Sequence, residues 1–163
     1  MLAIYSSRWI FAGLRDRGIS LPSDIQSQGA YDLVVVNENI AYASGQLPRL
    51  NSSGEIVTGS LSTGSDLAEA QSAARLCLCR ALLALHQELG DLSQVRRLVY
   101  MRGFIKSTPD FDRHGAVMDA ASKLACDLFG EAGRHARSAL GVSSLPGSGL
   151  VEIELTAALR RPF

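Results

Sequence analysis

Two groups of charged side chains near the end of the chain could act together on a small carboxylate. Arg134, His135 and Arg137 cluster at the start of a predicted strand, and Glu152 and Glu154 alternate along the next one. If these strands are antiparallel neighbours, an arginine and a glutamate converge on one cleft. Arginine binds a planar carboxylate through two parallel hydrogen bonds, and a nearby glutamate can orient water or move a proton. On spacing alone, the simpler interpretation is favoured: a cross-strand ion pair with surface charges around it.

Sequence motifs of the common nucleotide-binding and hydrolytic sites are absent. There is no Gly-x-Gly-x-x-Gly or Walker loop, no His-Glu-x-x-His and no Gly-x-Ser-x-Gly. The spacing of the three scattered histidines favours no metal site (His86, His114 and His135). We expect the three cysteines to be unpaired and buried like small hydrophobic residues, in a reducing compartment (Cys77, Cys79 and Cys126).

The composition predicts one soluble globular domain. The chain has 163 residues, of which 47% are hydrophobic and 20% charged, and this length suffices for one core but not for two ordinary domains. Sixteen basic and sixteen acidic residues cancel, which argues against binding to nucleic acid, because that affinity depends on neutralising phosphates. No apolar run of about 18 residues is present, so we expect no transmembrane helix and a cytoplasmic protein.

Apolar periodicity predicts an α+β sandwich with the element order ββαβαββ. Period-2 and β-branched segments predict five strands, at residues 31–36, 40–45, 95–106, 136–145 and 150–159. Repeats of three or four residues predict two long helices, at 66–89 and 113–129, after a short one at 8–16. Asp66 and Glu69 have the spacing of a capping box, and Gly90 is placed to end the first long helix.

The run Val34-Val35-Val36 indicates a strand that is covered on both faces. Two helices can cover only one face of the predicted sheet, so the other face needs a different cover. We therefore expect another subunit there and infer a homo-oligomer.

Four segments, in this order, resemble the YjgF/YER057c/UK114 family, also called RidA-like proteins and formerly endoribonuclease L-PSP. They are YASGQLP at 42–48, ARSALGV at 136–142, LP at 145–146 and VEIE at 151–154. The resemblance covers about residues 29–159 and is closest to a divergent bacterial branch. It implies an N-terminal extension over 1–28 before a single RidA-like domain over 29–163. It also implies a chorismate-mutase-like fold, with two helices on one face of a mixed sheet, in a homotrimer with a central β-barrel and clefts between subunits.

The resemblance further implies hydrolysis of reactive enamines and imines to 2-keto acids and ammonia, without a cofactor. Arg137 matches the arginine that binds the substrate carboxylate, and Glu152 matches the acidic residue that positions the attacking water. Tyr31 matches a tyrosine that lines the cleft, and Ser44 and Gly45 lie where the family packs the ligand. A fixed arginine and a glutamate can promote this reaction by orientation and electrostatics.

Four positions depart from the family pattern. Ala139 replaces a common cysteine, Asp32-Leu33 replaces Ser-Gln, and Asp119 stands where an asparagine is common. An acid at position 119 would repel a carboxylate ligand unless it is protonated or turned away. We therefore keep as an alternative a non-catalytic keto-acid-binding or regulatory protein that uses the same cleft. Endoribonuclease activity, implied by the older family name, is the least favoured because the chain is neutral and has no RNA-reading motif.

Overall fold

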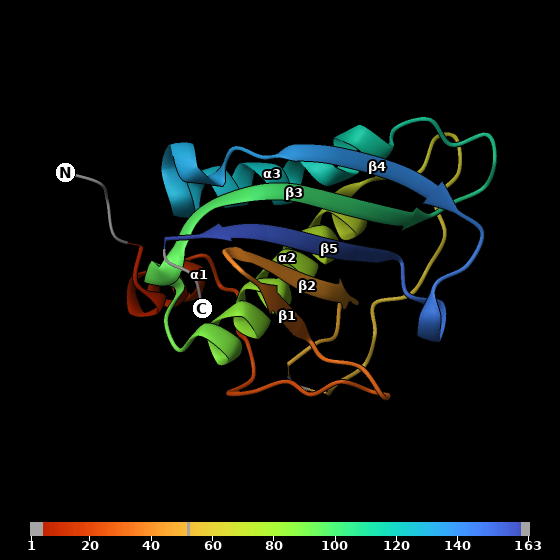
Figure 1. Cartoon of the computed structure of the whole chain (residues 1–163). Helices are drawn as coiled ribbons and strands as arrows, with labels where there is room; N and C mark the ends of the chain where they lie inside the picture. Colours follow the sequence, from red (N-terminus) through yellow and green to blue (C-terminus); the bar gives the residue numbers. More distant parts are fainter. Residues whose placement is uncertain (1–4, 52, 161–163) are drawn as a thin grey trace.

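Periodic apolar residues form the two long helices that the sequence predicts. The computed structural model describes residues 5–51 and 53–160, in which α2 spans Ala68–Leu89 and α3 spans His114–Phe129 (Figure 1). The predicted stripe of α2 is buried throughout (Ala70, Ala74, Leu78, Ala81, Leu85 and Leu89). The first four residues of the predicted N-terminal extension and the last three of the predicted domain lie outside the described residues.

Five strands form one mixed sheet with the order β1-β2-β5-β3-β4. Their bounds are Val34–Asn37, Ile40–Gln46, Val95–Lys106, Ala136–Val142 and Val151–Leu159, for β1 to β5 in that order. β3 and β4 are parallel and are joined through α3, whereas the other neighbouring pairs are antiparallel. β5, the last strand of the chain, lies between β2 and β3 near the middle of the sheet.

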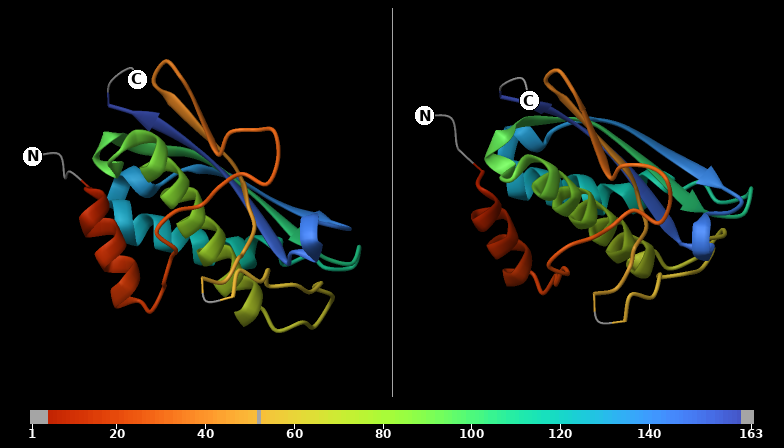
Figure 2. Two further views of the ribbon diagram at one scale, coloured as in Figure 1. Left: turned by 90° about the horizontal axis from the view of Figure 1, so that it is seen from below. Right: turned by 60° about the horizontal axis from the view of Figure 1, so that its bottom comes forward.

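The long helices cover one face of this sheet, as predicted. Figure 2 shows α2 and α3 on the same side, with the sheet running across them. The core side chains of β5 (Val151, Ile153, Leu155 and Ala157) face this helical layer and are at most 1% exposed. None of the described helices is long and apolar enough to cross a membrane.

No helix of the described part of the chain covers the opposite face of the sheet. Val35 of β1 pairs with Tyr42 of β2, and these side chains are 51% and 49% exposed. Leu140 of β4 is 45% exposed, although its parallel neighbour Phe104 is half-buried. The three consecutive valines of β1 therefore divide between the faces, because Val34 packs into the core while Val35 points the other way.

A third helix, α1 (Ser7–Asp16), packs against the C-terminal end of α2. The Ser7 hydroxyl accepts a hydrogen bond from the backbone N–H of Leu92 at 2.8 Å and lies 2.9 Å from Nδ1 of His86. The ring of Phe11 meets the imidazole of His86 edge-on. The segment after α1 is attached to α2 as well, because the side chain of Gln87 bonds both backbone groups of Ile25. This attachment places residues 22–28 beside the sheet edge.

Several predicted boundaries differ in the structure. The fourth strand ends at Val142 rather than at 145. The first strand begins at Val34 rather than at 31, because residues 31–33 form a bend that precedes it. The capping box is not formed: α2 starts at Ala68, whose N–H donates to the Asp66 carboxylate at 3.1 Å, and no side-chain bond caps the helix at Leu67. Gly90 does end α2, with a positive φ of 77°.

Candidate functional site

Glu152 lies on the uncovered face of β5, close to the end of β2. Its neighbours Val151 and Ile153 are fully buried against the helices, so the alternation of the strand turns Glu152 the other way. The carboxyl group rests against the backbone of Gly45 in β2. A Cβ at position 45 would stand 2.8 Å from Cδ of Glu152 and closer still to Oε1. Glycine at this position is therefore required for the observed place of the carboxylate.

The environment of Glu152 favours its neutral form. Burial raises the pKa of this carboxyl group, and the negative charge of Glu154 adds to the effect. Glu154 itself pairs with Arg102 of β3 at 2.9 Å. Among residues 5–51 and 53–160, none donates a hydrogen bond to the side-chain carboxyl group of Glu152. Its oxygens are thus available to water or to a ligand.

Tyr31 lines the same cavity as Glu152 and Gly45, as the resemblance implies. Its side chain is half exposed. Ser44 has a different place: its hydroxyl donates to the carbonyl of Asp32 at 2.7 Å, and its N–H donates to the carbonyl of Leu33 at 2.9 Å. Ser44 therefore holds the bend that carries Tyr31 against β2, and its hydroxyl is engaged within the chain.

Arg137 of β4 lies on the helical side of the sheet. It pairs in register with Met101 of β3, which is fully buried on that side. Its Nη1 donates to Asp119 at 2.9 Å and to the Ser122 hydroxyl at 3.0 Å, both on α3. The guanidinium side chain is 25% exposed and the Asp119 side chain 71%. Asp119 is therefore turned toward Arg137 and pairs with it, rather than being turned away.

His135 completes this second cluster. Its Nε2 lies 3.2 Å from the Ser122 hydroxyl, and its Nδ1 lies 2.6 Å from the carbonyl oxygen of Gly133. Burial is the main cause that lowers the pKa of His135, and the positive charge of Arg137 acts in the same direction. The ring therefore favours its neutral form and supports the arginine through Ser122.

The structure corrects one inference from the sequence: the strands of Arg137 and Glu152 are not neighbours. β3 lies between them, and β4 runs parallel to β3. Along β3, Arg137 is opposite Met101, whereas Glu152 is opposite Phe104. The two side chains also point to opposite faces of the sheet. One chain therefore forms two separate clusters. Arg137 and Glu152 of the same chain neither share a cleft nor form a cross-strand ion pair. Glu154 does form a cross-strand ion pair, with Arg102.

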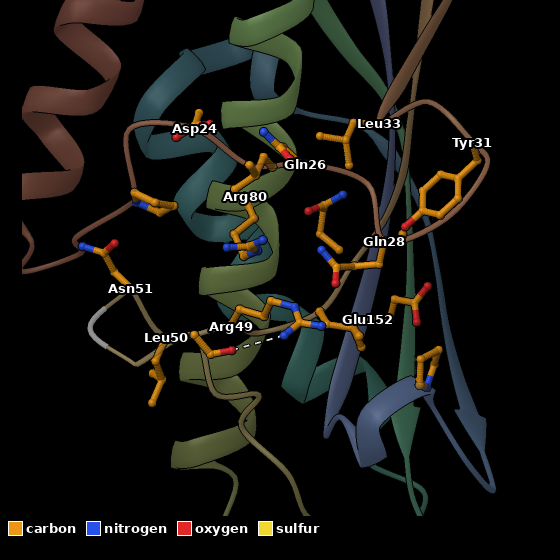
Figure 3. A pocket seen from close by; sticks show the side chains of 17 residues that line it. Asp24, Gln26, Gln28, Tyr31, Leu33, Arg49, Leu50, Asn51, Arg80 and Glu152 are labelled. Atoms are coloured by element: carbon orange, nitrogen blue, oxygen red, sulfur yellow. Dashed lines mark hydrogen bonds between the residues drawn. The ribbon is translucent and has the colours of Figure 1, made fainter.

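The cavity beside Glu152 has a volume of about 370 Å³ and contains two arginines that the sequence analysis missed. Arg49 comes from the loop after β2 and Arg80 from the middle of α2, as Figure 3 shows. Arg80 is only 9% exposed. The sequence did contain a signal for Arg80, which is the single charged residue in the apolar run from Leu76 to Leu85. A charge at such a position indicates a special role, because charged residues are seldom buried without a partner.

The remaining histidines and cysteines form no common site. No group of three or more metal-binding side chains is found in the described part of the chain. Cys77 and Cys79 are buried, as predicted, and Cys126 is half-buried. Burial raises the pKa of Cys79 to about 12, so this thiol stays protonated.

Comparisons with known proteins identify the family. A family model described as "YjgF/chorismate_mutase-like, putative endoribonuclease" matches residues 7–159. Protein TCP17 of Trypanosoma cruzi is 35% identical over 159 residues, which are 97% of this chain and 99% of that protein. The crystal structure of Atu1372 from Agrobacterium tumefaciens, a protein of unknown function, is 39% identical over 92% of both chains, with a TM-score of 0.83. E. coli TdcF with bound serine is 25% identical over 81% of this chain and 90% of its own, with a TM-score of 0.57. The chain thus belongs to the YjgF/chorismate mutase-like family.

Proposed function

We propose that this protein is a RidA-like deaminase that hydrolyses small 2-imino and 2-enamino acids to 2-keto acids and ammonia. The observation that carries the proposal is the carboxyl group of Glu152. It is half-buried in a cavity, is held against Gly45, and accepts no hydrogen bond from the described residues. Such a group is suited to orienting a water molecule beside a bound substrate.

The reaction needs proton transfers and an oriented water, with no oxidant or reductant. An enamine first becomes the imine when a proton moves to its terminal carbon. Water then adds to the imine carbon and forms a C–O bond, and Glu152 orients this water and accepts a proton from it. The imine nitrogen takes up one proton as the C–O bond forms and a second one that Glu152 returns. The C–N bond then breaks and ammonia leaves, while the hydroxyl group gives up its proton to solvent and becomes the carbonyl. The raised pKa of Glu152 brings its proton affinity closer to that of a useful base at neutral pH.

Arg137 is the proposed partner of the substrate carboxylate. Its bonds to Asp119 and Ser122 use Nη1 alone. Within the described residues, Nε and Nη2 make no hydrogen bond, so the edge formed by these two nitrogens can bind a carboxylate through two parallel bonds. E. coli TdcF, a structure of this fold, holds serine, a small molecule with the same carboxylate group.

The proposed cleft lies between subunits of a homotrimer. Arg137 and Glu152 point to opposite faces of one sheet and are separated by β3, so a small ligand cannot touch both within one chain. A neighbouring copy can bring its Arg137 to this Glu152. The uncovered face of the sheet supports such an assembly, because Val35, Tyr42 and Leu140 expose apolar surface there.

A second candidate is a binding protein that takes up a keto acid in the same cleft without turnover. The ion pair of Asp119 and Arg137 favours it, because the acid competes with a ligand carboxylate for the guanidinium group. The two candidates make the same prediction for Arg137 and different ones for Glu152.

Deamination of 2-iminobutanoate, generated in the assay by a dehydratase, tests the proposal. We expect the protein to accelerate keto-acid release, and Arg137→Ala to abolish both this acceleration and keto-acid binding. Glu152→Gln should retain binding and lose turnover. Arg134→Ala is the matched control, because Arg134 is three residues from Arg137, its side chain is 70% exposed, and among the described residues this side chain pairs only with the 92% exposed Glu131.

The possible results separate the candidates. Keto-acid binding without acceleration in the wild type would favour the binding protein. Full activity of Glu152→Gln would refute the role of the carboxylate. Light scattering at micromolar concentration should give a trimer, and a monomer that remains active would refute the cleft between subunits.

A further inference from the structure

The middle of α2 contains a buried cation that has no partner among the described residues. Arg80 is 9% exposed, and its Nε has no hydrogen-bond acceptor. Within residues 5–51 and 53–160, its guanidinium group forms neither a hydrogen bond nor an ion pair. A buried charge normally has a partner, because removing it from water is costly unless hydrogen bonds or an opposite charge compensate. Arg80 therefore lacks, within the chain, the compensation that its position requires.

A second guanidinium group faces the same cavity. Figure 3 shows Arg49 and Arg80 in the same part of the cavity, reaching it from a loop and from α2. Arg49 uses Nη1 to donate to the carbonyl of Gly54 at 3.2 Å, which fixes its side chain across the loop. Burial lowers the pKa of Arg80, and the positive charge of Arg49 lowers it further. Two like charges thus converge on one space, where an anion would be attracted to both.

The other polar lining of the cavity suits an oxyanion. Gln26 and Gln28 bring amide groups to it. Asn51 also lines it, and its Nδ2 donates to the Ser20 hydroxyl at 2.8 Å. Two acids also line it, Asp24 and Glu152, but neither forms an ion pair with Arg49 or Arg80 among the described residues. Gln26 and Gln28 are held in place because Ile25, between α1 and these residues, is bonded on both sides by Gln87 of α2.

We propose that Arg80 and Arg49 bind the carboxylate or phosphate group of a small molecule in this cavity. The site goes beyond the proposed deaminase function, because the anion binds to Arg49 and Arg80, which that function does not use; within one chain it is also far from Arg137, at the edge strand β4. Its volume of about 370 Å³ is at the lower end of small-molecule sites. The same cavity reaches Tyr31 and Glu152, so a ligand held at Arg80 extends toward the proposed catalytic carboxylate.

Calorimetric titration of the full chain with inorganic phosphate and with succinate tests this site. All measurements use an Arg137→Met background, which removes the other proposed carboxylate site. We expect at least one probe to bind, and the tighter one identifies a phosphate or a carboxylate as the natural group. Arg80→Met should weaken that binding by roughly 10- to 100-fold, the usual effect of losing charge-assisted hydrogen bonds.

Two further variants keep the test decisive. Arg75→Met is the matched control, because Arg75 lies on the same helix outside this cavity and its side chain bonds only Ser72 among the described residues. This variant should bind the probe as tightly as its background. Arg49→Gln replaces Arg80→Met if the latter does not fold, and it should weaken binding in the same direction.

Absence of binding by both probes would overturn the proposal. The proposal would also be overturned if the Arg80 and Arg49 variants bound the probe as tightly as the Arg137→Met background. The same holds if Arg75→Met weakened binding as much as Arg80→Met does. Neither result depends on turnover, so failure of the deaminase assay and failure of this site can be told apart.

Discussion

Replacing Gly45 with alanine should displace the carboxylate of Glu152 without unfolding the protein. The new Cβ would stand 2.8 Å from Cδ and 3.1 Å from Cγ of Glu152. Carbon atoms not bonded to each other prefer separations of about 3.5 Å or more. The carboxyl carbon must therefore retreat by roughly 0.7 Å, and the oxygen nearest to the new methyl group by more, so the carboxylate moves by about 1 Å.

The expected consequences differ for activity and stability. A misplacement of about 1 Å can lower a rate by roughly 100-fold when catalysis depends on orientation. The backbone of Gly45 is not in the left-handed region, and alanine loses less conformational entropy than glycine in a strand, by about 0.5–1 kcal/mol. The obstacle is the end of a flexible side chain, which can rotate away. We therefore expect a free energy of unfolding within about 1 kcal/mol of the wild type.

Keto-acid release and urea denaturation measure these two quantities. Gly13→Ala is the matched control, because a Cβ there makes only ordinary contacts, at 3.4 Å or more, with Arg17 and Leu128. In a Glu152→Ala background, Gly45→Ala should change neither stability nor residual activity, since the carboxyl group that it displaces is gone. Wild-type activity in the Gly45→Ala single variant would refute the argument that the position of this carboxylate matters.

Two further predictions concern the charges around the site. Asp119→Asn should tighten keto-acid binding at Arg137 by roughly 2- to 5-fold, because exposed ion pairs contribute about 0.2–1 kcal/mol; a weaker affinity in the titration would contradict competition by the acid. The acid limb of the pH–rate profile should lie above the usual range of a glutamate, because the pKa of Glu152 is raised, and Glu154→Gln should move this limb to lower pH. For the same reason the wild type should lose stability as pH rises through that raised pKa, in denaturation curves from about pH 4 to 8. A slope that persists in Glu152→Gln would assign this loss to another group.

Local patterns predicted the elements well, because each pattern is set by neighbours along the chain. The stripe of α2 and the end at Gly90 follow from spacing and from glycine's freedom at positive φ. The strand pairing was not predictable in the same way. β5 lies between β2 and β3 in the sheet. Apolar periodicity cannot distinguish this long-range pairing from a simple hairpin of β5 with β4. The strand–helix–strand pattern before it did contain a signal, since parallel neighbours need such a crossover.

The sequence named candidate residues but not the geometry in which the structure places them. Glu152 and Tyr31 line one cavity, whereas Arg137 lies on the other face of the sheet. Motifs list residues in chain order and carry no information on the face that each strand presents after pairing. Arg80 was missed for a related reason. It lies in a helix that is buried on several sides, and its position in the sequence shows that the charge needs a partner. The sequence does not show where that partner lies.

The two arginine sites pose opposite electrostatic problems. Arg137 is partly exposed and already shares its charge with Asp119, so a ligand carboxylate must compete for it. Arg80 is buried without such a partner among the described residues, so an anion there supplies a compensation that these residues do not. Glu152 lines the same cavity as Arg80 and Arg49. An anion bound near Glu152 would oppose ionisation of its carboxyl group. By reciprocity, an ionised Glu152 would weaken the binding of that anion. The length and charge of a ligand that extends from Arg80 therefore bear directly on the protonation state of the proposed catalytic group.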